Sequence, residues 1–288
     1  YAKCGFLLEA CELFDKLSSQ DVVSGTTLIT RYIEHGCWKK ALECFQQMQK
    51  MGSSLNSLTY ACGLKACGTI GGMREGQEIH SEVVKKGFEI EIQSSNVLID
   101  MYAKCGFLAE AQDVFDKLWG SGDMISWNAI MAGYSQLGAT EIVLDFFHKM
   151  VGNDHVKPNS VTFLSVLNAC SDGGFVNIAH MLFVSMRNVF GLIQTLDHFT
   201  CMIDLLGRAG HIDEVVSTIE KMPFHPGIVA WHSVLGACKK WGNVDLAKHA
   251  FEYALCLDDQ SLAPYIFMSN IYSDCTVSKQ AKENEVYE

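Results

Sequence analysis

Residues 92–123 read IQSSNVLIDMYAKCGFLAEAQDVFDKLWGSGD, and their apolar residues follow a helical period on both sides of a central glycine. Before Gly106, four apolar residues share one helical face: Val97, Leu98, Met101 and Tyr102. After it, the apolar residues recur at helical spacing again: Leu108, Ala111, Val114, Phe115 and Leu118. Because glycine readily ends a helix, this stretch predicts two amphipathic helices that form a helical hairpin.

The same hairpin recurs along the chain. Residues 1–17, YAKCGFLLEACELFDKL, are identical to residues 102–118 at thirteen of seventeen positions. Six predicted helix ends share a closing glycine: DMYAKCG (100–106), DLLGRAG (204–210), KACGTIG (65–71), NACSDGG (168–174), GACKKWG (236–242) and AGYSQLG (132–138). Alignment on these ends predicts repeats of 32–36 residues at 22–56, 57–91, 92–123, 124–159, 160–195, 196–227 and 228 to about 260.

A two-helix repeat of this size cannot bury its apolar faces alone, so neighbouring repeats must stack. We therefore expect an all-α fold, a right-handed α-solenoid whose first helices line one curved surface. With 49% apolar residues and only four prolines among 288 residues, the composition suits many short helices joined by turns. The net charge of −11 disfavours polyanion binding unless lysines and arginines gather locally.

Three kinds of repeat alternate, and their wording resembles one protein family. The phrases that carry the resemblance are NVLIDMYAKCG (96–106), ISWNAIMAGYSQ (125–136), VTFLSVLNACS (161–171) and CMIDLLGRAGHIDE (201–214). The chain resembles a plant pentatricopeptide repeat (PPR) protein of the PLS subclass. The resemblance implies a partial S-type repeat at 1–21, a PLS-PLS array at 22–227 and a truncated E-type extension at 228–275. The polar residues 276–288 depart from the pattern, and we expect them to fray.

The resemblance also implies single-stranded RNA binding, with one base read by the fifth and last residues of each repeat. The pairs that would read bases are Thr26 with Asn56, Asn96 with Asp123, Asn128 with Asn159, and Thr200 with Gly227. They imply A, U, a pyrimidine and a purine in that order, a preference of 5′-A-n-U-Y-n-R-3′. Two further pairs have an apolar fifth residue and are expected to be spacers: Ala61 with Glu91, and Leu164 with Thr195.

Two more sets of residues would add affinity. Val23 and Ile125, second in their repeats, would sandwich bases, and four basic residues would contact phosphates: Lys3, Lys104, Arg208 and Lys240. The reading requires Thr26, Asn96, Asn128 and Thr200 to lie in file on the inner wall, open to a strand. The alternative for these four residues is helix capping.

No catalytic or metal-binding signature stands up in the sequence. His80-Ser81-Glu82 matches half of a zinc deaminase motif, but no Cys-x-x-Cys accompanies it. Cysteines recur once per repeat at Cys67, Cys170 and Cys238, and at Cys4 and Cys105, which predicts small buried packing residues and free thiols. Trp127 and Trp231 are likewise expected to pack between repeats. We expect no enzyme activity and no cofactor.

The resemblance implies a site-recognition factor for organellar RNA processing, namely C-to-U editing in a mitochondrion or chloroplast. The E-type region would recruit a deaminase in trans. Because so few repeats read too few bases, and the first residue is not Met, we expect further repeats and a targeting segment upstream. Two alternatives remain: a tetratricopeptide-like protein scaffold, although the repeat length is not an invariant 34, and a decayed or mispredicted gene product.

Overall fold

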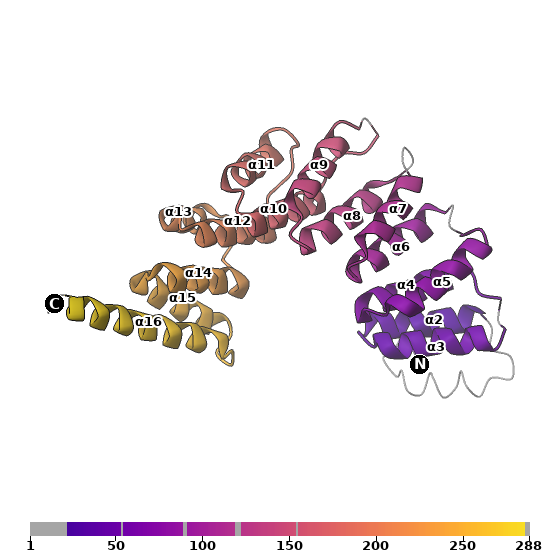
Figure 1. The fold of residues 1–288 in the computed structure, drawn as a ribbon, viewed down its shortest axis with the longest axis horizontal. Helices are drawn as coiled ribbons and strands as arrows, with labels where there is room; N and C mark the ends of the chain where they lie inside the picture. The colour runs from indigo at the N-terminus through magenta and orange to yellow at the C-terminus, as the bar shows by residue number, and fades with distance from the viewer. Residues whose placement is uncertain (1–21, 53, 89–90, 119–121, 154, 286–288) are drawn as a thin grey trace. The chain divides into compact units, whose positions relative to one another are not determined.

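The computed structural model describes residues 22–285, except residues 53, 89–90, 119–121 and 154. These described residues form fifteen helices and no strand, which confirms the predicted all-α fold (Figure 1). The predicted partial repeat at 1–21, with Lys3 and Cys4, lies outside the described residues. None of the helices in the described part of the chain combines the length and the hydropathy that crossing a bilayer requires.

The helices follow one another in pairs, and one pair falls in each predicted repeat range. The pairs are α2 (Val22–Glu34) and α3 (Trp38–Lys50), α4 (Ser57–Ile70) and α5 (Met73–Lys85), α6 (Ile92–Lys104) and α7 (Leu108–Lys117), α8 (Met124–Gln136) and α9 (Thr140–Val151), α10 (Ser160–Gly173) and α11 (Val176–Asn188), α12 (Leu196–Ala209) and α13 (Ile212–Lys221), and α14 (Ile228–Trp241) and α15 (Val244–Leu257). A last helix, α16 (Ala263–Glu285), follows them.

The chain divides into two compact units. The first comprises Tyr1–Leu137 and Asn153–Val156, and the second comprises Gly138–Gly152 and Lys157–Glu288. Within the first, the first helices of the repeats, α2, α4, α6 and α8, pack in succession, and the second helices lie against them. The second unit repeats this arrangement with α10, α12, α14 and α16. Each unit is therefore a two-layer stack of helix pairs.

Glycine ends the first helices, as predicted. All six closing glycines have a positive φ, between 69° and 87°, in the left-handed region that other residues avoid: Gly71, Gly106, Gly138, Gly174, Gly210 and Gly242. At Gly210 a side chain is excluded for a second reason, because a Cβ there would lie 2.8 Å from the Trp241 ring. Each turn therefore reverses the chain without room for a larger residue at this point.

Small residues let consecutive first helices approach closely. A Cβ on Gly133 of α8 would lie 2.6 Å from Ala103 Cβ of α6, inside van der Waals contact. In the second unit, a Cβ on Gly207 of α12 would lie 2.8 Å from Ala237 Cβ of α14. The distance between neighbouring first helices is thus fixed by pairs of the smallest side chains.

Aromatic and sulfur-containing residues fill the space between the layers. Trp127 packs edge-on against Phe115 with ring centroids 5.0 Å apart, and Trp231 stacks on Tyr253 at 4.7 Å. Both tryptophans are buried, which confirms their predicted packing role. Three cysteines are fully buried, also as predicted: Cys67, Cys170 and Cys238. Burial raises the pKa of the Cys67 thiol to about 12, so this residue is an uncharged packing group.

The end of the chain differs from expectation. The sequence predicts that residues from 276 onward fray, but α16 continues to Glu285. The segment SKQAKENE (278–285) is polar, yet Lys, Gln, Ala and Glu are strong helix formers, so polarity alone does not end the helix.

Candidate nucleic-acid interface

The last residue of each repeat is the N-cap of the first helix in the next repeat. These N-caps are Asn56 of α4, Glu91 of α6, Asp123 of α8, Asn159 of α10, Thr195 of α12 and Gly227 of α14. A helix begins with unsatisfied N–H groups, and short polar side chains accept hydrogen bonds from them. The predicted base-reading residues at the ends of repeats therefore also have a structural role.

The fifth residues are not caps. Asn96, Asn128 and Thr200 lie inside their helices, each five residues after the N-cap. The capping alternative raised by the sequence is therefore wrong for these three residues, because their side chains lie more than a turn beyond the unsatisfied N–H groups.

Asn96 and Asp123 are brought together by the packing of α6 against α8. Asn96 Nδ2 donates to both carboxylate oxygens of Asp123, at 3.0 and 3.2 Å. The same carboxylate caps α8 by accepting from the backbone N–H groups of Ile125 and Ser126, each at 3.0 Å. Asp123 thus fixes where the amide nitrogen of Asn96 points.

Thr26 and Asn56 are joined through a third residue. The Thr26 hydroxyl lies 2.7 Å from the Thr59 hydroxyl, which in turn lies 2.7 Å from Asn56 Oδ1. Thr26 is only 5% exposed and Asn96 7%. These two fifth residues are therefore less open than the sequence predicts, because the neighbouring first helix packs against them.

The remaining pairs are placed differently. Asn128 lies in the first compact unit and Asn159 in the second, and both are half-buried. Asn159 forms a capping box with Thr162. Thr200 donates to the carbonyl oxygen of Leu196 in its own helix, at 2.9 Å. Its partner position, Gly227, has no side chain, so no contact equivalent to that of Asn96 with Asp123 forms there.

The two predicted spacer pairs present no amide at the fifth position. Ala61 and Leu164 are half-buried, whereas Glu91 and Thr195 are exposed. Thr195 forms a capping box with the buried His198, whose Nε2 lies 2.9 Å from the carbonyl oxygen of Ser160. These two repeats hold no hydrogen-bonding fifth side chain for a base edge.

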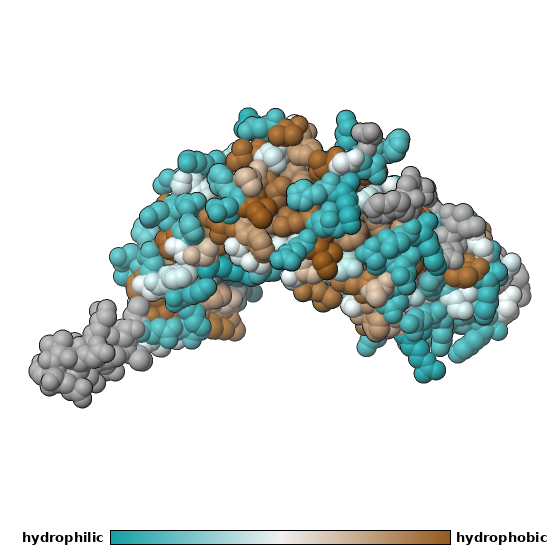
Figure 2. Space-filling model, turned by 45° about the horizontal axis from the view of Figure 1, so that its top comes forward, coloured by the Kyte–Doolittle hydropathy of each residue, from teal (hydrophilic) through white to brown (hydrophobic). Residues whose placement is uncertain are grey.

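Exposed aliphatic side chains recur at the second position of repeats. Val23 is 73% exposed and Ile125 59%. Three residues at the same register are also exposed and escaped the sequence prediction: Leu58, Val161 and Val229. The repeat register alone could have identified them. Such side chains remain at the protein surface at a cost, and Figure 2 shows hydrophobic surface between the hydrophilic side chains.

The predicted phosphate contacts lie at the ends of first helices, where most are already paired. Lys104 Nζ lies 2.7 Å from Asp100, and the Arg208 guanidinium binds Asp172 at 3.0 Å and Asp204 at 2.9 Å. Lys240 instead donates to the carbonyl oxygen of Arg208 at 2.8 Å, with its amine 5.1 Å from the Trp241 ring. Carboxylates therefore offset the charge of Lys104 and Arg208.

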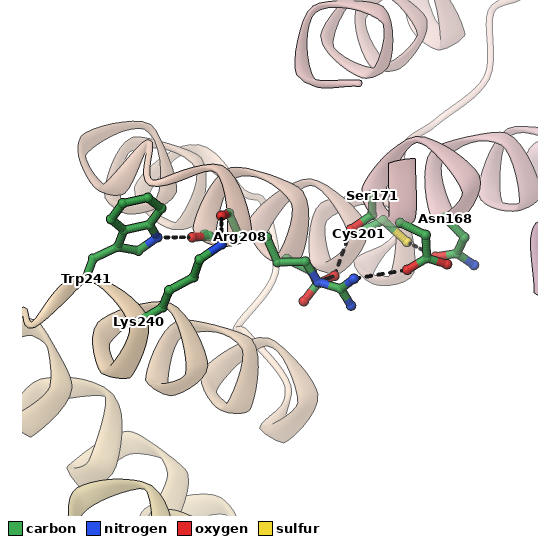
Figure 3. A network of polar contacts seen from close by, with 9 residues as sticks. Asn168, Ser171, Cys201, Arg208, Lys240 and Trp241 are labelled. Carbon is green, nitrogen blue, oxygen red and sulfur yellow. Dashed lines mark hydrogen bonds and ion pairs between the residues drawn. The ribbon is translucent and has the colours of Figure 1, made fainter. Parts of the chain in front are cut away.

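Lys240 and Arg208 belong to a polar network that joins α10, α12 and α14 (Figure 3). Ser171 donates to Asp204 at 2.7 Å, and Trp241 Nε1 donates to the carbonyl oxygen of Gly207 at 2.8 Å. Together with the contacts of Arg208, these bonds link the C-terminal ends of three consecutive first helices.

His80 has a packing role. Its Nδ1 lies 2.7 Å from the Tyr102 hydroxyl, and the two rings meet edge to face at 5.5 Å. Within the described residues, no group of three or more His, Cys, Asp or Glu side chains is arranged to hold a metal ion.

The repeats match known family models. The PPR repeat family model matches residues 20–69 and 122–172, and the PPR repeat model matches 1–22, 94–123 and 197–224. Together these matches cover more than half of the chain. The chain belongs to the pentatricopeptide repeat family.

Two relatives from Arabidopsis thaliana illustrate the similarity of this PPR chain to longer proteins. "Pentatricopeptide repeat-containing protein At1g06140, mitochondrial" is 37% identical over 274 residues, which are 95% of this chain and 49% of that protein. "Pentatricopeptide repeat-containing protein At1g08070, chloroplastic" is 36% identical over 277 residues, 95% of this chain and 37% of that protein. The PPR chain therefore spans about half the length, or less, of these relatives.

Solved structures share the fold of the PPR chain. The crystal structure of PPR10 from maize has a TM-score of 0.52 at 18% identity and covers 98% of this chain and 51% of that one. The PPR domain of Arabidopsis thaliana protein-only RNase P 1, solved in complex with tRNA, has a TM-score of 0.51 at 18% identity. It covers 61% of this chain and 95% of that domain. At this identity the likeness concerns the fold alone.

Proposed function

We propose that this PPR chain binds single-stranded RNA sequence-specifically and reads one base with each polar pair of fifth and last residues. The contact between Asn96 and Asp123 carries the proposal. The carboxylate holds one amide N–H of Asn96, which leaves the second N–H and the carbonyl oxygen to meet a base edge. Uracil offers a matching acceptor and donor on neighbouring atoms, O4 and N3–H.

The other pairs complete the proposed recognition sequence, 5′-A-n-U-Y-n-R-3′. Thr26 with Asn56 would take A, Asn128 with Asn159 a pyrimidine, and Thr200 with Gly227 a purine. The exposed side chains of Val23 and Ile125 would flank the bases, and Lys240 would contact a phosphate. The solved complex of another PPR domain with tRNA supports RNA as the class of ligand.

We further propose a PLS-PLS array at 22–227 and an E-type extension at 228–275, which would recruit a deaminase in trans for C-to-U editing. No deaminase motif occurs in this sequence, so the chain would supply the address for the chemistry. Relatives named mitochondrial and chloroplastic support an organellar site of action.

Binding to matched and scrambled RNAs tests the proposal. Fluorescence anisotropy with 5′-A-n-U-Y-n-R-3′ and a scrambled sequence, over a salt series, should show about tenfold or greater preference for the matched RNA. Asn96→Thr should shift the preference at its base from U toward a purine. Thr27→Asn is the matched control for Thr26→Asn, because the neighbouring Thr27 is exposed and donates to Val23 of its own helix. A protein scaffold would ignore both the RNA sequence and the exchanges.

A further inference from the structure

Each polar pair in the first compact unit contains a third, buried member. It is the third residue of the following first helix: Thr59 for the pair of Thr26 and Asn56, and Ser126 for the pair of Asn96 and Asp123. Both hydroxyl-bearing residues are fully buried, at 0% exposure. They therefore meet their neighbouring side chains without competition from water.

We propose that Thr59 and Ser126 are positioning residues for base selection. Their hydroxyls set the orientation of the fifth residue of the preceding repeat, and through it the base edge that this residue accepts. The inference rests on the RNA reading proposed above and adds a third residue to each reading pair.

Ser126 holds the side of the Asn96 amide that Asp123 does not. Its hydroxyl donates to Asn96 Oδ1 and also lies 3.1 Å from Asp123 Oδ1. The amide nitrogen of Asn96 therefore faces a carboxylate, and its oxygen faces a hydroxyl. A flipped amide would place two acceptors, Asn96 Oδ1 and the Asp123 carboxylate, against each other, which is repulsive. The orientation that suits uracil is thus favoured over the reverse orientation, which suits cytosine.

Thr59 acts on a hydroxyl instead of an amide. Thr26 Oγ1 lies 2.6 Å from the carbonyl oxygen of Val22 and 2.7 Å from Thr59 Oγ1, while Thr59 Oγ1 lies 2.7 Å from Asn56 Oδ1. Two hydroxyl protons therefore serve more acceptors than they can satisfy at once. When Thr26 turns its proton to a base, Thr59 can donate to the oxygen that remains, so the rearrangement leaves no buried hydroxyl without a partner.

The second compact unit contains a natural comparison. Ala230, 1% exposed, takes the place of Ser126 in α14, and Gly227 takes the place of Asp123. Thr200 is therefore held by the carbonyl of its own helix alone among the contacts of its hydroxyl. Base selection at the repeat 196–227 should be weaker than at 92–123 for this reason.

The test compares RNAs that differ only in the base under the repeat 92–123. The unmodified chain should prefer U over C there, and Ser126→Ala should lower this ratio by about fivefold to tenfold, as expected for one hydrogen bond. Ser126→Thr keeps a hydroxyl and should retain the ratio. Ser135→Ala, a buried serine further along α8, is the control for a merely structural effect and should leave the ratio unchanged.

A second readout needs no RNA. In the unmodified chain the side-chain NH₂ signals of Asn96 in an NMR spectrum should be dispersed, and Ser126→Ala should shift them while Ser135→Ala does not. If the unmodified chain distinguishes U from C but Ser126→Ala keeps the full ratio, the positioning role is overturned and RNA reading stands. If the unmodified chain does not distinguish the two bases, RNA reading fails at this repeat, and the inference fails with it.

Discussion

Asn96 and Asp123 stand 27 residues apart in the chain, and the amide nitrogen of one lies 3.0 Å from a carboxylate oxygen of the other. The bond runs from the first helix of one repeat to the N-cap of the next first helix. One carboxylate therefore starts α8 and orients a side chain on α6. In this pair, helix capping and the proposed base reading depend on the same atoms.

Removal of the Asp123 carboxylate should destabilise the fold. Asp123→Ala removes the cap of α8 and leaves the buried Asn96 amide without its acceptor, so we expect the free energy of unfolding to fall by about 2 kcal/mol. Asp123→Asn keeps an oxygen at the cap and should cost less than half as much. Urea unfolding followed by circular dichroism measures both, and equal losses would contradict the dual role.

Gly227→Asp should stabilise the chain. Gly227 has extended backbone angles, φ −76° and ψ 171°, and a Cβ there would meet only Leu196 Cδ2 at 3.5 Å. The new carboxylate can cap α14, and the unfolded chain loses flexibility, so the free energy of unfolding should rise by about 0.5–1 kcal/mol. Thermal denaturation gives the change, and a lower melting temperature would show that the cap does not form.

Two glycines on first helices should respond to alanine with opposite signs. Gly133→Ala forces a Cβ to 2.6 Å from Ala103 Cβ, and the overpacking should cost about 1–3 kcal/mol. At Gly236 of α14 a Cβ meets only Phe267 Cε1 at 4.0 Å, so Gly236→Ala should gain about 0.5–1 kcal/mol from helix propensity. Urea titration of both variants decides the matter, since changes of the same sign would disprove the close approach of α6 and α8.

Buried thiols should react slowly and make stability fall at high pH. Burial raises the pKa of Cys67 and of Cys201 from 9.0 to about 12, so both remain protonated at pH 8, where the exposed Cys256 should be alkylated first by iodoacetamide. A raised pKa favours the folded state below pH 9, and this contribution is lost as the pH rises from 9 to 12. Peptide mass mapping after timed alkylation measures the order, and early labelling of Cys67 would contradict it.

Lys240 should contribute to RNA binding through its charge. Lys240→Gln should weaken binding to all sequences alike and lower the salt dependence by about 0.7, the value for one phosphate contact on a single strand. Lys149→Gln is the control, because Lys149 lies on the second helix α9 and pairs with Asp145 at 2.6 Å. Anisotropy titrations at several salt concentrations give the slopes, and identical slopes for the two variants would remove Lys240 from the interface.

The helix pairs and their glycine ends could be predicted from sequence, because both depend on local period and on the backbone freedom of residues such as Gly106. The partners of the fifth residues could not. The hydroxyl of Thr59 reaches Thr26 across 33 residues, and only the packing of α4 against α2 brings them together. The pairing of Arg208 with Asp172 spans 36 residues and escaped prediction for the same reason.

The polar network at the ends of α10, α12 and α14 has a consequence for how the second compact unit melts. Fraying of the last turn of α14 would break the bonds of Trp241 and Lys240 to α12, and fraying of α12 would release Asp172 and Ser171 of α10. Local opening at any one of these termini therefore spreads to its neighbours. In hydrogen exchange, the amides at the three helix ends should lose protection as one cooperative group.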